Sequence, residues 1–302
     1  MADITLTLPF RMPDGSPYDA QRYDWCRYYY FNNSYEETIK LGPWGVNSSF
    51  VSGVYIEEKI ALQGNHPFLW REHYIRIVRI ASKMGIDEFA LPTASELKRK
   101  IELICSKNHY PPFSLITIYV WTEYNQGIRY AIFQSRRDKS VYDVHSGELR
   151  LMSSPENFVL TNIANDEMGI NRSTEKILDS QAQMHGLDGS CVVNSYGKIV
   201  RTTLGNIYMI MRGGVVVGVD AESGGLNDPI DRTLQDIIGE NGLNYQTCNG
   251  ITSEMTRTAF ECFVCSAAEG LRPVLSVGTS TRFRREIGYK LAAAMRDYFA
   301  IF

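Results

Sequence analysis

Cys262 and Cys265 are separated by two residues, a CxxC spacing that occurs in metal sites and in redox-active pairs. A structural zinc site takes four ligands, and neither a second CxxC nor a nearby histidine completes such a set. The surrounding segment, FECFVCSA, is apolar enough for a buried strand, and free cysteine packs readily as a small hydrophobic residue. We therefore predict that both thiols lie in the core and that no metal is bound.

The elements that must position a site alternate between strands and helices. In the first part of the chain, strands are predicted at 26–33, 50–62 and 113–121, and helices at 67–84 and 94–108. In the second part, helices are predicted at 170–185, 229–241, 253–259 and 281–299, and strands at 189–195, 206–211 and 260–266. The pattern predicts an α+β protein with an N-terminal α/β lobe over 1–135, a polar linker over 136–160 and a C-terminal α/β lobe over 161–302. Within the linker segment, VYDV and ELRLM are candidates for short strands.

Composition and charge exclude several classes of protein. The 302 residues are 44% hydrophobic and 22% charged, with a formal net charge of -3, and they lack the clustered Lys and Arg of a nucleic-acid surface. No window approaches the roughly 20 apolar residues that cross a bilayer. The N-terminus, MADITLTLPF, has neither the basic nor the apolar region of a signal peptide. We expect a cytoplasmic protein without nucleic-acid or membrane partners.

Four segments carry a family resemblance when they are taken in order. They are SGVYIEE at 52–58, WREHYIRIVRIASKMG at 70–85, GKIVRTTLGNIYMI at 197–210, and DPIDRTLQDI at 228–237 with FVCSAAEGLRPV at 263–274. Together they resemble the class IV pyridoxal-phosphate (PLP) aminotransferases, which include branched-chain and D-amino-acid aminotransferases and aminodeoxychorismate lyase. The resemblance implies a two-lobed fold-type IV structure of the D-amino-acid aminotransferase kind.

The resemblance also implies a division of roles around PLP, which the family holds between its two domains. A lysine forms a Schiff base with the cofactor, and a glutamate keeps the pyridine nitrogen protonated. An arginine and the amides at a helix start bind the phosphate. Arg76 matches that arginine and Ser266 matches a hydroxyl residue that contacts phosphate, so both are candidate anion-binding residues.

The positions for PLP chemistry depart from the family pattern. Anchored on Asn171, the Schiff-base lysine falls on Glu167 or Met168, and Arg201 stands where the family has glutamate. At the phosphate helix, Pro229 has no amide N–H and Asp231 places a carboxylate where an anion should lie. We therefore expect no covalent PLP, while non-covalent binding of PLP stays open.

Glu167 and Arg201 exchange the charges of the family's lysine and glutamate, and two interpretations stay open. They can form a buried ion pair that fills the vacated pocket. Alternatively, Glu167 is a general base and Arg201 anchors a substrate carboxylate, since a desolvated carboxylate can have a pKa suited to proton transfer.

Three functions are consistent with these residues. The first is a PLP-independent enzyme of the isomerase, lyase or cyclase type, acting on a small anionic metabolite, with Tyr55 and Tyr119 lining the cleft unless they pack in the core. The second is a non-catalytic ligand-binding protein or partner subunit. The third is an unorthodox PLP aminotransferase with its lysine supplied from elsewhere. Because class IV proteins are usually dimers, the resemblance also implies a homodimer.

Overall fold

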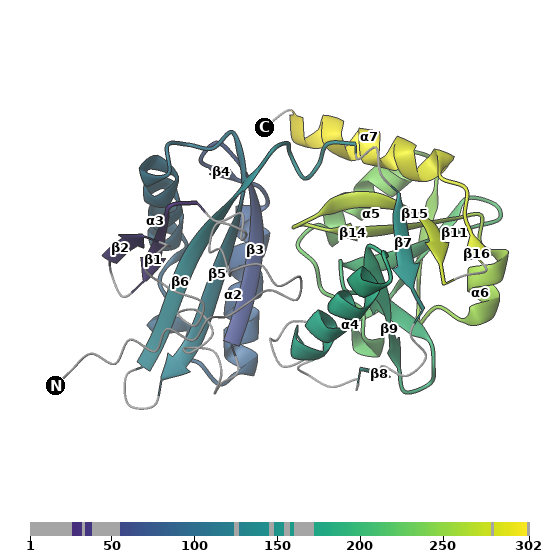
Figure 1. The fold of residues 1–302 in the computed structure, drawn as a ribbon, viewed down its shortest axis with the longest axis horizontal. Coiled ribbons are helices and arrows are strands. Elements are labelled where there is room, and N and C mark those ends of the chain that lie inside the picture. The colour runs from purple at the N-terminus through teal and green to yellow at the C-terminus, as the bar shows by residue number, and fades with distance from the viewer. Residues whose placement is uncertain are drawn as a thin grey trace.

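The computed structural model describes residues 26–31, 34–37, 55–123, 127–144, 148–153, 158–159, 172–278 and 281–300. They form two lobes, each built on its own sheet (Figure 1). The chain passes from one sheet to the other after β6 (Gly127–Arg137), so the two sheets do not merge across the boundary. The two-lobed α+β prediction is confirmed.

The N-terminal lobe is a six-stranded antiparallel sheet with two helices on one face. Its strand order is β2 (Ser34–Glu37), β1 (Tyr28–Phe31), β6, β5 (Phe113–Glu123), β3 (Tyr55–Gln63) and β4 (His66–Pro67). Helices α2 (Trp70–Lys83) and α3 (Ala94–Lys107) bury their apolar stripes against this sheet. A reciprocal capping box between Thr93 and Glu96 begins α3.

Strand β3 gives the N-terminal lobe its face toward the second lobe (Figure 1). Successive side chains of a strand point to opposite faces of the sheet. Ile56, Ile60 and Leu62 accordingly pack in the core beneath α2 and α3. Glu57 and Lys59 point the other way and face the second lobe.

The C-terminal lobe is built on a larger mixed sheet. Its path is β10 (Ile199–Thr202), β9 (Gly189–Asn194), β7 (Leu149–Met152), β15 (Gly270–Val277), β14 (Glu261–Ser266), β11 (Asn206–Met211), β12 (Val215–Val219) and β13 (Asn244–Cys248). Two short strands join this path, β8 (Phe158–Val159) beside β9 and β16 (Thr281–Arg282) beside β15. Its helices are α4 (Arg172–Met184), α5 (Asp231–Glu240), α6 (Ser253–Thr258) and α7 (Glu286–Ala300).

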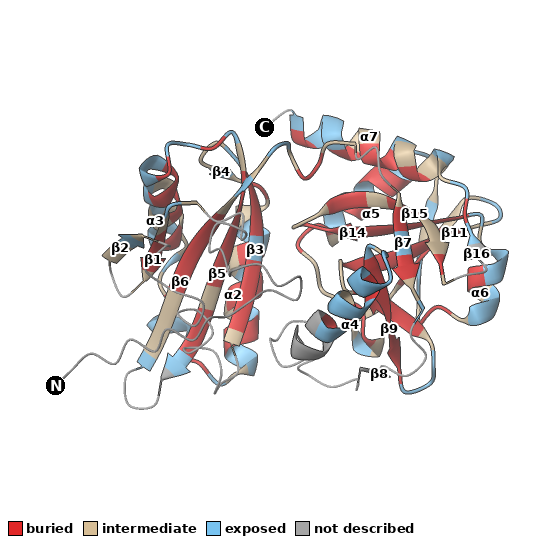
Figure 2. Ribbon diagram, viewed as in Figure 1, coloured by how far each residue is buried: buried red, intermediate tan, exposed pale blue. Residues whose placement is uncertain are grey.

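An apolar contact joins the lobes beside α7. Phe68 of the N-terminal lobe packs edge-on against Tyr142 and Phe299, with ring centroids 5.1 and 5.3 Å away. The rings of Tyr142 and Phe299 are stacked at 3.9 Å. Ala61 and Leu115 extend this cluster across the boundary, and the central parts of both sheets are buried (Figure 2). The contact fixes how the lobes face each other.

The sequence predictions differ from the structure at several places. Strand β7 lies in the ELRLM stretch of the segment predicted as a linker and belongs to the second sheet, because Leu149 and Leu151 alternate into its core. The helix predicted over 281–299 begins only at Glu286, since residues 281–282 pair with β15. The long strand β6 and the strands β13 and β15 had no counterpart among the predicted strands.

The predicted burial of Cys262 and Cys265 in the core is confirmed. Cys262 and Cys265 are free thiols buried in β14. Burial raises the pKa of both thiols well above their usual range, which disfavours the thiolate needed for metal or redox chemistry. Among the described residues, no group of three or more His, Cys, Asp or Glu side chains is placed to hold a metal ion.

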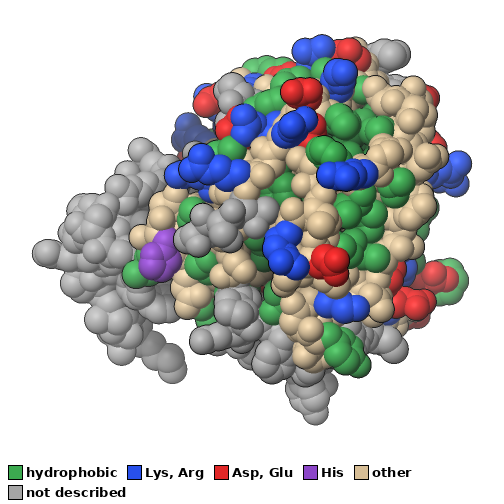
Figure 3. Space-filling model, turned by 90° about the vertical axis from the view of Figure 1, so that its right-hand side faces the viewer, with side chains coloured by type: hydrophobic (Ala, Val, Ile, Leu, Met, Phe, Trp, Pro, Cys, Tyr) green, Lys and Arg blue, Asp and Glu red, His purple; other side chains and the backbone are tan. Residues whose placement is uncertain are grey.

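The surface of the C-terminal lobe carries charges of both signs. On the outer face of the C-terminal lobe, basic and acidic side chains are interspersed with apolar ones (Figure 3). Within the described part of the chain, no helix has the length and apolar character needed to span a membrane.

Candidate functional site

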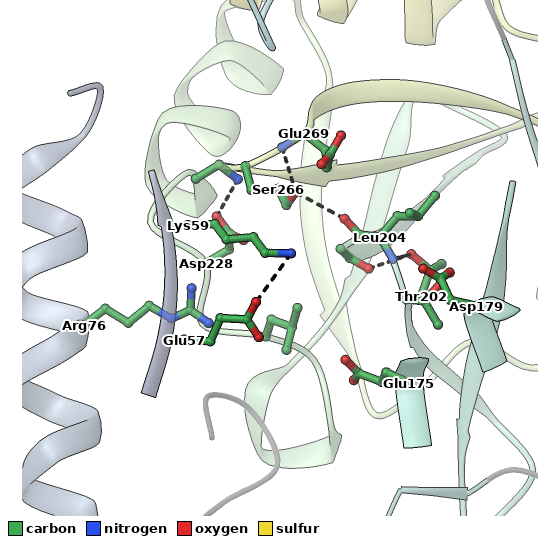
Figure 4. A pocket seen from close by; sticks show the side chains of 15 residues that line it. Glu57, Lys59, Arg76, Glu175, Asp179, Thr202, Leu204, Asp228, Ser266 and Glu269 are labelled. Atoms are coloured by element: carbon green, nitrogen blue, oxygen red, sulfur yellow. Dashed lines mark hydrogen bonds and ion pairs between the residues drawn. The ribbon is translucent and has the colours of Figure 1, made fainter. Parts of the chain in front are cut away.

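A cavity of about 190 Å³ lies between the two lobes. Side chains from β3 and α2 form one wall, and the C-terminal lobe forms the other (Figure 4). The charged lining residues are Glu57, Lys59, Arg76, Glu175, Asp179, Asp228 and Glu269. Among the described lining residues, both cations come from the N-terminal lobe, which also contributes Glu57, and the charged residues of the C-terminal lobe are all carboxylates.

The N-terminal wall contains two cations and one carboxylate. Lys59 Nζ lies 3.7 Å from Glu57 Oε1, and the Tyr119 hydroxyl donates to the same oxygen over 3.4 Å. Arg76 extends from α2 past β3 toward the cavity (Figure 4). This wall can bind an anionic group through two different cations.

Arg76 is held in place from behind by a buried acid. Its Nη1 lies 3.5 Å from Oε2 of Glu58, the β3 residue that faces α2. His73, one helical turn before Arg76, contacts the other oxygen of Glu58 through Nδ1. Glu58 and His73 are both fully buried, so they restrict the arginine to one orientation beside the cavity.

Asp228 fills a pair of backbone donors on the opposite wall. Its Oδ1 accepts from the amide of Ala267 at 2.8 Å and from the amide of Ile230 at 3.1 Å. The first donor lies just after β14 and the second just before α5. Amides at a helix start attract anions, and here the anion is a carboxylate of the protein itself.

A second carboxylate, Asp231, lies directly behind Asp228. Its Oδ2 accepts from the Asp228 amide at 2.8 Å, and its Oδ1 accepts from the Tyr208 hydroxyl at 3.2 Å. Burial raises the pKa of Asp231 to about 7, and the neighbouring charge of Asp228 acts in the same direction. The structure places Asp231 where the sequence predicted a charge unfavourable to phosphate, with a carboxyl group that is partly protonated near neutral pH.

Arg201 is buried beneath the cavity and bound on three sides. Its Nε and Nη2 donate to Oε1 of Glu175 at 2.9 and 2.8 Å, and its Nη1 donates to the carbonyl of Gly224 at 2.7 Å. The guanidinium is 1% exposed. Glu175, on α4, is therefore a partner of Arg201 that sequence reasoning missed.

The catalytic roles predicted for Glu167 and Arg201 have different outcomes. Glu167 lies outside the described residues, so its role as a general base stays a prediction. Arg201 lies next to the cavity wall, but its guanidinium is committed to Glu175 and to the backbone. These bonds favour a structural role for Arg201 over that of a substrate anchor.

The predicted binding residues are only partly brought together. Arg76 and Ser266 line the cavity, whereas Tyr55 and Tyr119 are not among its lining residues. Tyr55 packs edge-on against Tyr119 at 6.0 Å, and Tyr119 reaches the cavity only through its bond to Glu57. Ser266 donates its hydroxyl hydrogen to the carbonyl of Leu204 at 3.2 Å, which leaves it without a hydrogen to donate to a ligand.

Sequence reasoning also missed Asp228 and Lys59. Asp-Pro before a helix start is a turn signal in which the Asp side chain caps nearby amides, and Asp228 forms that bond to Ile230. Lys59 carried a signal in the alternation of β3, which places it on the same face as Glu57. Among the described lysines, Lys59 is the one that lines the cavity.

The lining does not match the residue set that the family resemblance implies for PLP. The pyridine position holds Arg201, bound to Glu175, and the amides at the phosphate position bind Asp228. The hydroxyl of Ser266 donates to the carbonyl of Leu204. What remains is a polar cavity with a cationic wall and an acidic wall, suited to a small molecule that carries charges of both signs.

Comparisons with known proteins agree with this architecture. A family model described as amino-transferase class IV matches residues 56–277. No curated protein sequence matches the chain significantly.

Solved structures share the fold at low sequence identity. A branched-chain aminotransferase from the archaeon Thermoproteus uzoniensis, solved with norvaline, is 21% identical, with 90% of this chain and 94% of that chain covered and a TM-score of 0.78. The branched-chain amino acid aminotransferase of Escherichia coli is 17% identical over 92% and 94%, with a TM-score of 0.74. A fold IV transaminase from Curtobacterium pusillum is 15% identical over 84% and 87%, with a TM-score of 0.71.

Proposed function

The chain belongs to the class IV aminotransferase family, and from this premise we propose that it works without a lysine-bound PLP and takes a small acidic metabolite directly into the cavity between its lobes. The observation that carries this proposal is that the side chain of Asp228 accepts from both the Ile230 and the Ala267 amides. A cofactor phosphate would need donors at this place, and it would meet a carboxylate instead.

The division of charge supports a ligand with an acidic end and an end that donates hydrogen bonds. Lys59 and Arg76 are the cations of the N-terminal wall, where a carboxylate can form charge-assisted hydrogen bonds. Glu175 and Asp179 on the opposite wall can accept from an amino or hydroxyl group. A small zwitterion or hydroxy acid satisfies both walls at once.

The reaction we propose is proton transfer, such as isomerisation, elimination or cyclisation. Glu57 faces the cavity beside Lys59 and accepts from Tyr119, so a carboxylate and an amine lie within reach of one ligand. A general base must lie within hydrogen-bonding distance of the proton that it removes. Glu57 lies 3.7 Å from Lys59, so a ligand bound to Lys59 would bring its protons near this carboxylate, and Glu167 remains a second candidate base.

A non-catalytic ligand-binding protein is the second candidate function. It is favoured by Arg201, whose guanidinium is bound by Glu175 and the Gly224 carbonyl and is therefore not available to a substrate. In this case the cavity binds its ligand without changing it, as a sensor or as the inactive partner of another subunit.

An unorthodox PLP aminotransferase is the third candidate, and Lys59 gives it a specific form. This amine lines the cavity from the N-terminal lobe and is the described residue that could carry an imine there. An absorbance spectrum of the purified protein tests this candidate. A visible imine band that disappears on treatment with borohydride would support it and overturn the proposal.

We also propose that the protein is a homodimer, on the strength of the family alone. Analytical ultracentrifugation should give twice the chain mass of 34.3 kDa. A monomer that binds ligand with full affinity would contradict this part of the proposal without affecting the cavity.

The binding proposal is tested by thermal shift against a panel of amino acids, hydroxy acids and dicarboxylates. We expect at least one member to raise the melting temperature of the wild type, because a ligand bound only by the folded state stabilises it. Lys59→Met should weaken that shift. Lys198→Met is the matched control, since Lys198 bonds to Asn249 and does not line the cavity.

The reaction is tested by proton exchange of the bound ligand in heavy water, followed by proton NMR. An enzyme of the proposed type exchanges a carbon-bound proton of the ligand, and Glu57→Gln or Glu167→Gln should stop the exchange while leaving the thermal shift in place. Binding without exchange in the wild type would favour the non-catalytic candidate.

A further inference from the structure

Asp228 has an unusual position for a carboxylate that lines a cavity. Its oxygen Oδ1 is bound to two backbone amides, those of Ile230 and Ala267, at 3.1 and 2.8 Å. One amide belongs to the turn that begins α5, and the other follows the end of β14. Two convergent N–H groups next to a helix start form a site of the kind that binds oxyanions.

Three further hydrogen-bond donors around this place already have acceptors in the protein. The Ser266 hydroxyl donates to the Leu204 carbonyl at 3.2 Å, and its oxygen accepts from the Glu269 amide at the same distance. The amide of Asp228 itself donates to Asp231 at 2.8 Å. A phosphate entering here would find its hydrogen-bond donors taken.

The local charge works in the same direction. Asp228, Asp231 and Glu269 gather around the β14–β15 turn and the start of α5. The nearest printed cation to Glu269 is Arg137, 3.4 Å away at the lobe boundary. Like charges repel strongly where burial lowers the effective dielectric constant.

We infer that Asp228 is a specificity-determining residue, which excludes phosphate and other oxyanion groups from the C-terminal end of the cavity by occupying their amide donors with its own carboxylate. The natural ligand therefore carries no phosphate and places its acidic group at the Lys59 and Arg76 wall. This statement about the natural ligand rests on the proposed function. The exclusion itself is a property of Asp228 that can be measured with inorganic phosphate.

Three variants separate the carboxylate's charge from its occupation of the amides. Asp228→Ala removes the side-chain oxygens and frees both amides. Asp228→Asn removes the charge and keeps an oxygen that can accept from the same amides. Asp179→Asn removes a different cavity charge, since Asp179 accepts from the Thr203 hydroxyl at 2.6 Å and touches neither amide.

The experiment is a phosphate titration of the purified protein and the three variants, followed by isothermal calorimetry and by the melting temperature. We expect Asp228→Ala to bind phosphate about tenfold more tightly than the wild type or better, the gain expected from charge-assisted hydrogen bonds. Asp228→Asn should gain less than Asp228→Ala, because it removes the like charge but keeps both amides occupied, and Asp179→Asn should remain close to the wild type. If Asp228→Ala fails to fold, Asp228→Gly is measured in its place, because it also removes the side-chain acceptor and frees both amides, with the same expected direction.

Two results would overturn the inference. One is a wild type that already binds phosphate as tightly as Asp228→Ala, and the other is a gain in Asp179→Asn equal to that in Asp228→Ala, which would reflect general charge and not occupied amides. The test does not depend on the proposed function. A wild type that binds no small acid would end that proposal and leave the phosphate result standing.

Discussion

Two charged clusters at the same cavity, one buried and one half-buried, are stabilised in different ways. In the first, Arg201 of β10 meets Glu175 of α4, and opposite charges pair across two elements. In the second, the carboxyl groups of Asp228 and Asp231 lie three positions apart in the sequence and accept hydrogen bonds from backbone amides. The pKa of Asp231 is raised, so that a bound proton removes part of its charge. One cluster balances charge with charge, and the other with amide dipoles and a proton.

This difference predicts how the stability contributed by each cluster responds to substitution and to pH. A pair of opposite charges depends on both members, so the loss of one leaves a buried charge uncompensated. A carboxylate bound by amides and partly protonated depends on pH instead. The clusters can therefore be distinguished by mutation and by titration.

The largest expected effect is that of Arg201→Ala. It leaves Glu175 buried without its cationic partner, and breaking a buried pair typically costs about 3–5 kcal/mol of the free energy of unfolding. Urea unfolding followed by circular dichroism measures this cost. The double variant Arg201→Met with Glu175→Leu is the control and should recover much of the loss, because it removes both charges. A single variant as stable as the wild type would contradict a structural ion pair.

A smaller effect is expected for Asp228→Ala. Two amides lose their acceptor, and unsatisfied buried donors cost about 1–3 kcal/mol. Asp228→Asn should cost less, because its amide oxygen can still accept from the same donors. Equal losses in both variants, measured in the same urea experiment, would mean that charge and not amide occupation is what stabilises this turn.

The pH dependence of stability should come from Asp231. Its pKa rises from 3.8 in the unfolded chain to about 7 in the folded state. The folded state therefore binds more protons between about pH 4 and 7, and stability from this group is present below that window and lost as pH rises through it. Asp231→Asn should flatten the curve of melting temperature against pH in that window. An unchanged slope would show that another group causes it.

The smallest effect on stability is expected for Lys59, which is half-exposed beside the buried carboxylate of Glu57. Lys59 is 43% exposed and lies 3.7 Å from Glu57, and pairs of this kind contribute about 0–1 kcal/mol. Lys59→Met should therefore lower the free energy of unfolding in urea by less than Arg201→Ala or Asp228→Ala does. A large loss would mean that Lys59 is part of the framework, and its effect on ligand binding could then not be read as a direct contact.

The fold could be predicted from the sequence because its evidence is local. The helix around Arg76 and the strand that carries Cys262 and Cys265 can be recognised from the pattern of apolar residues within each segment, without information on the segments that they contact. Strand β6 was missed because its burial depends on pairing with both β5 and β1, which is a long-range property. The start of α7 was predicted too early for the same reason, because residues 281–282 form a short strand that pairs with β15.

The site was predictable only in part. Arg76 and Ser266 do line the cavity, and both lie in segments that carry the family resemblance. The partner of Arg201 was not predictable, because Glu175 is separated from it by 26 positions and is selected by the packing of α4 on β9. Asp228 was passed over in favour of Asp231, although the Asp-Pro turn signal lay in the sequence. Its contact with Ala267, 39 positions away, is visible only in three dimensions.

The central claim is that the cofactor positions of this class IV protein are satisfied by its own side chains. The most direct measurement is intact mass spectrometry after incubation with PLP and reduction with borohydride, followed by peptide mapping. We expect the wild-type mass to remain that of the unmodified chain under conditions in which an active class IV aminotransferase is fully labelled. A stoichiometric phosphopyridoxyl adduct on a single lysine, with Lys59 the first to be inspected, would contradict the claim.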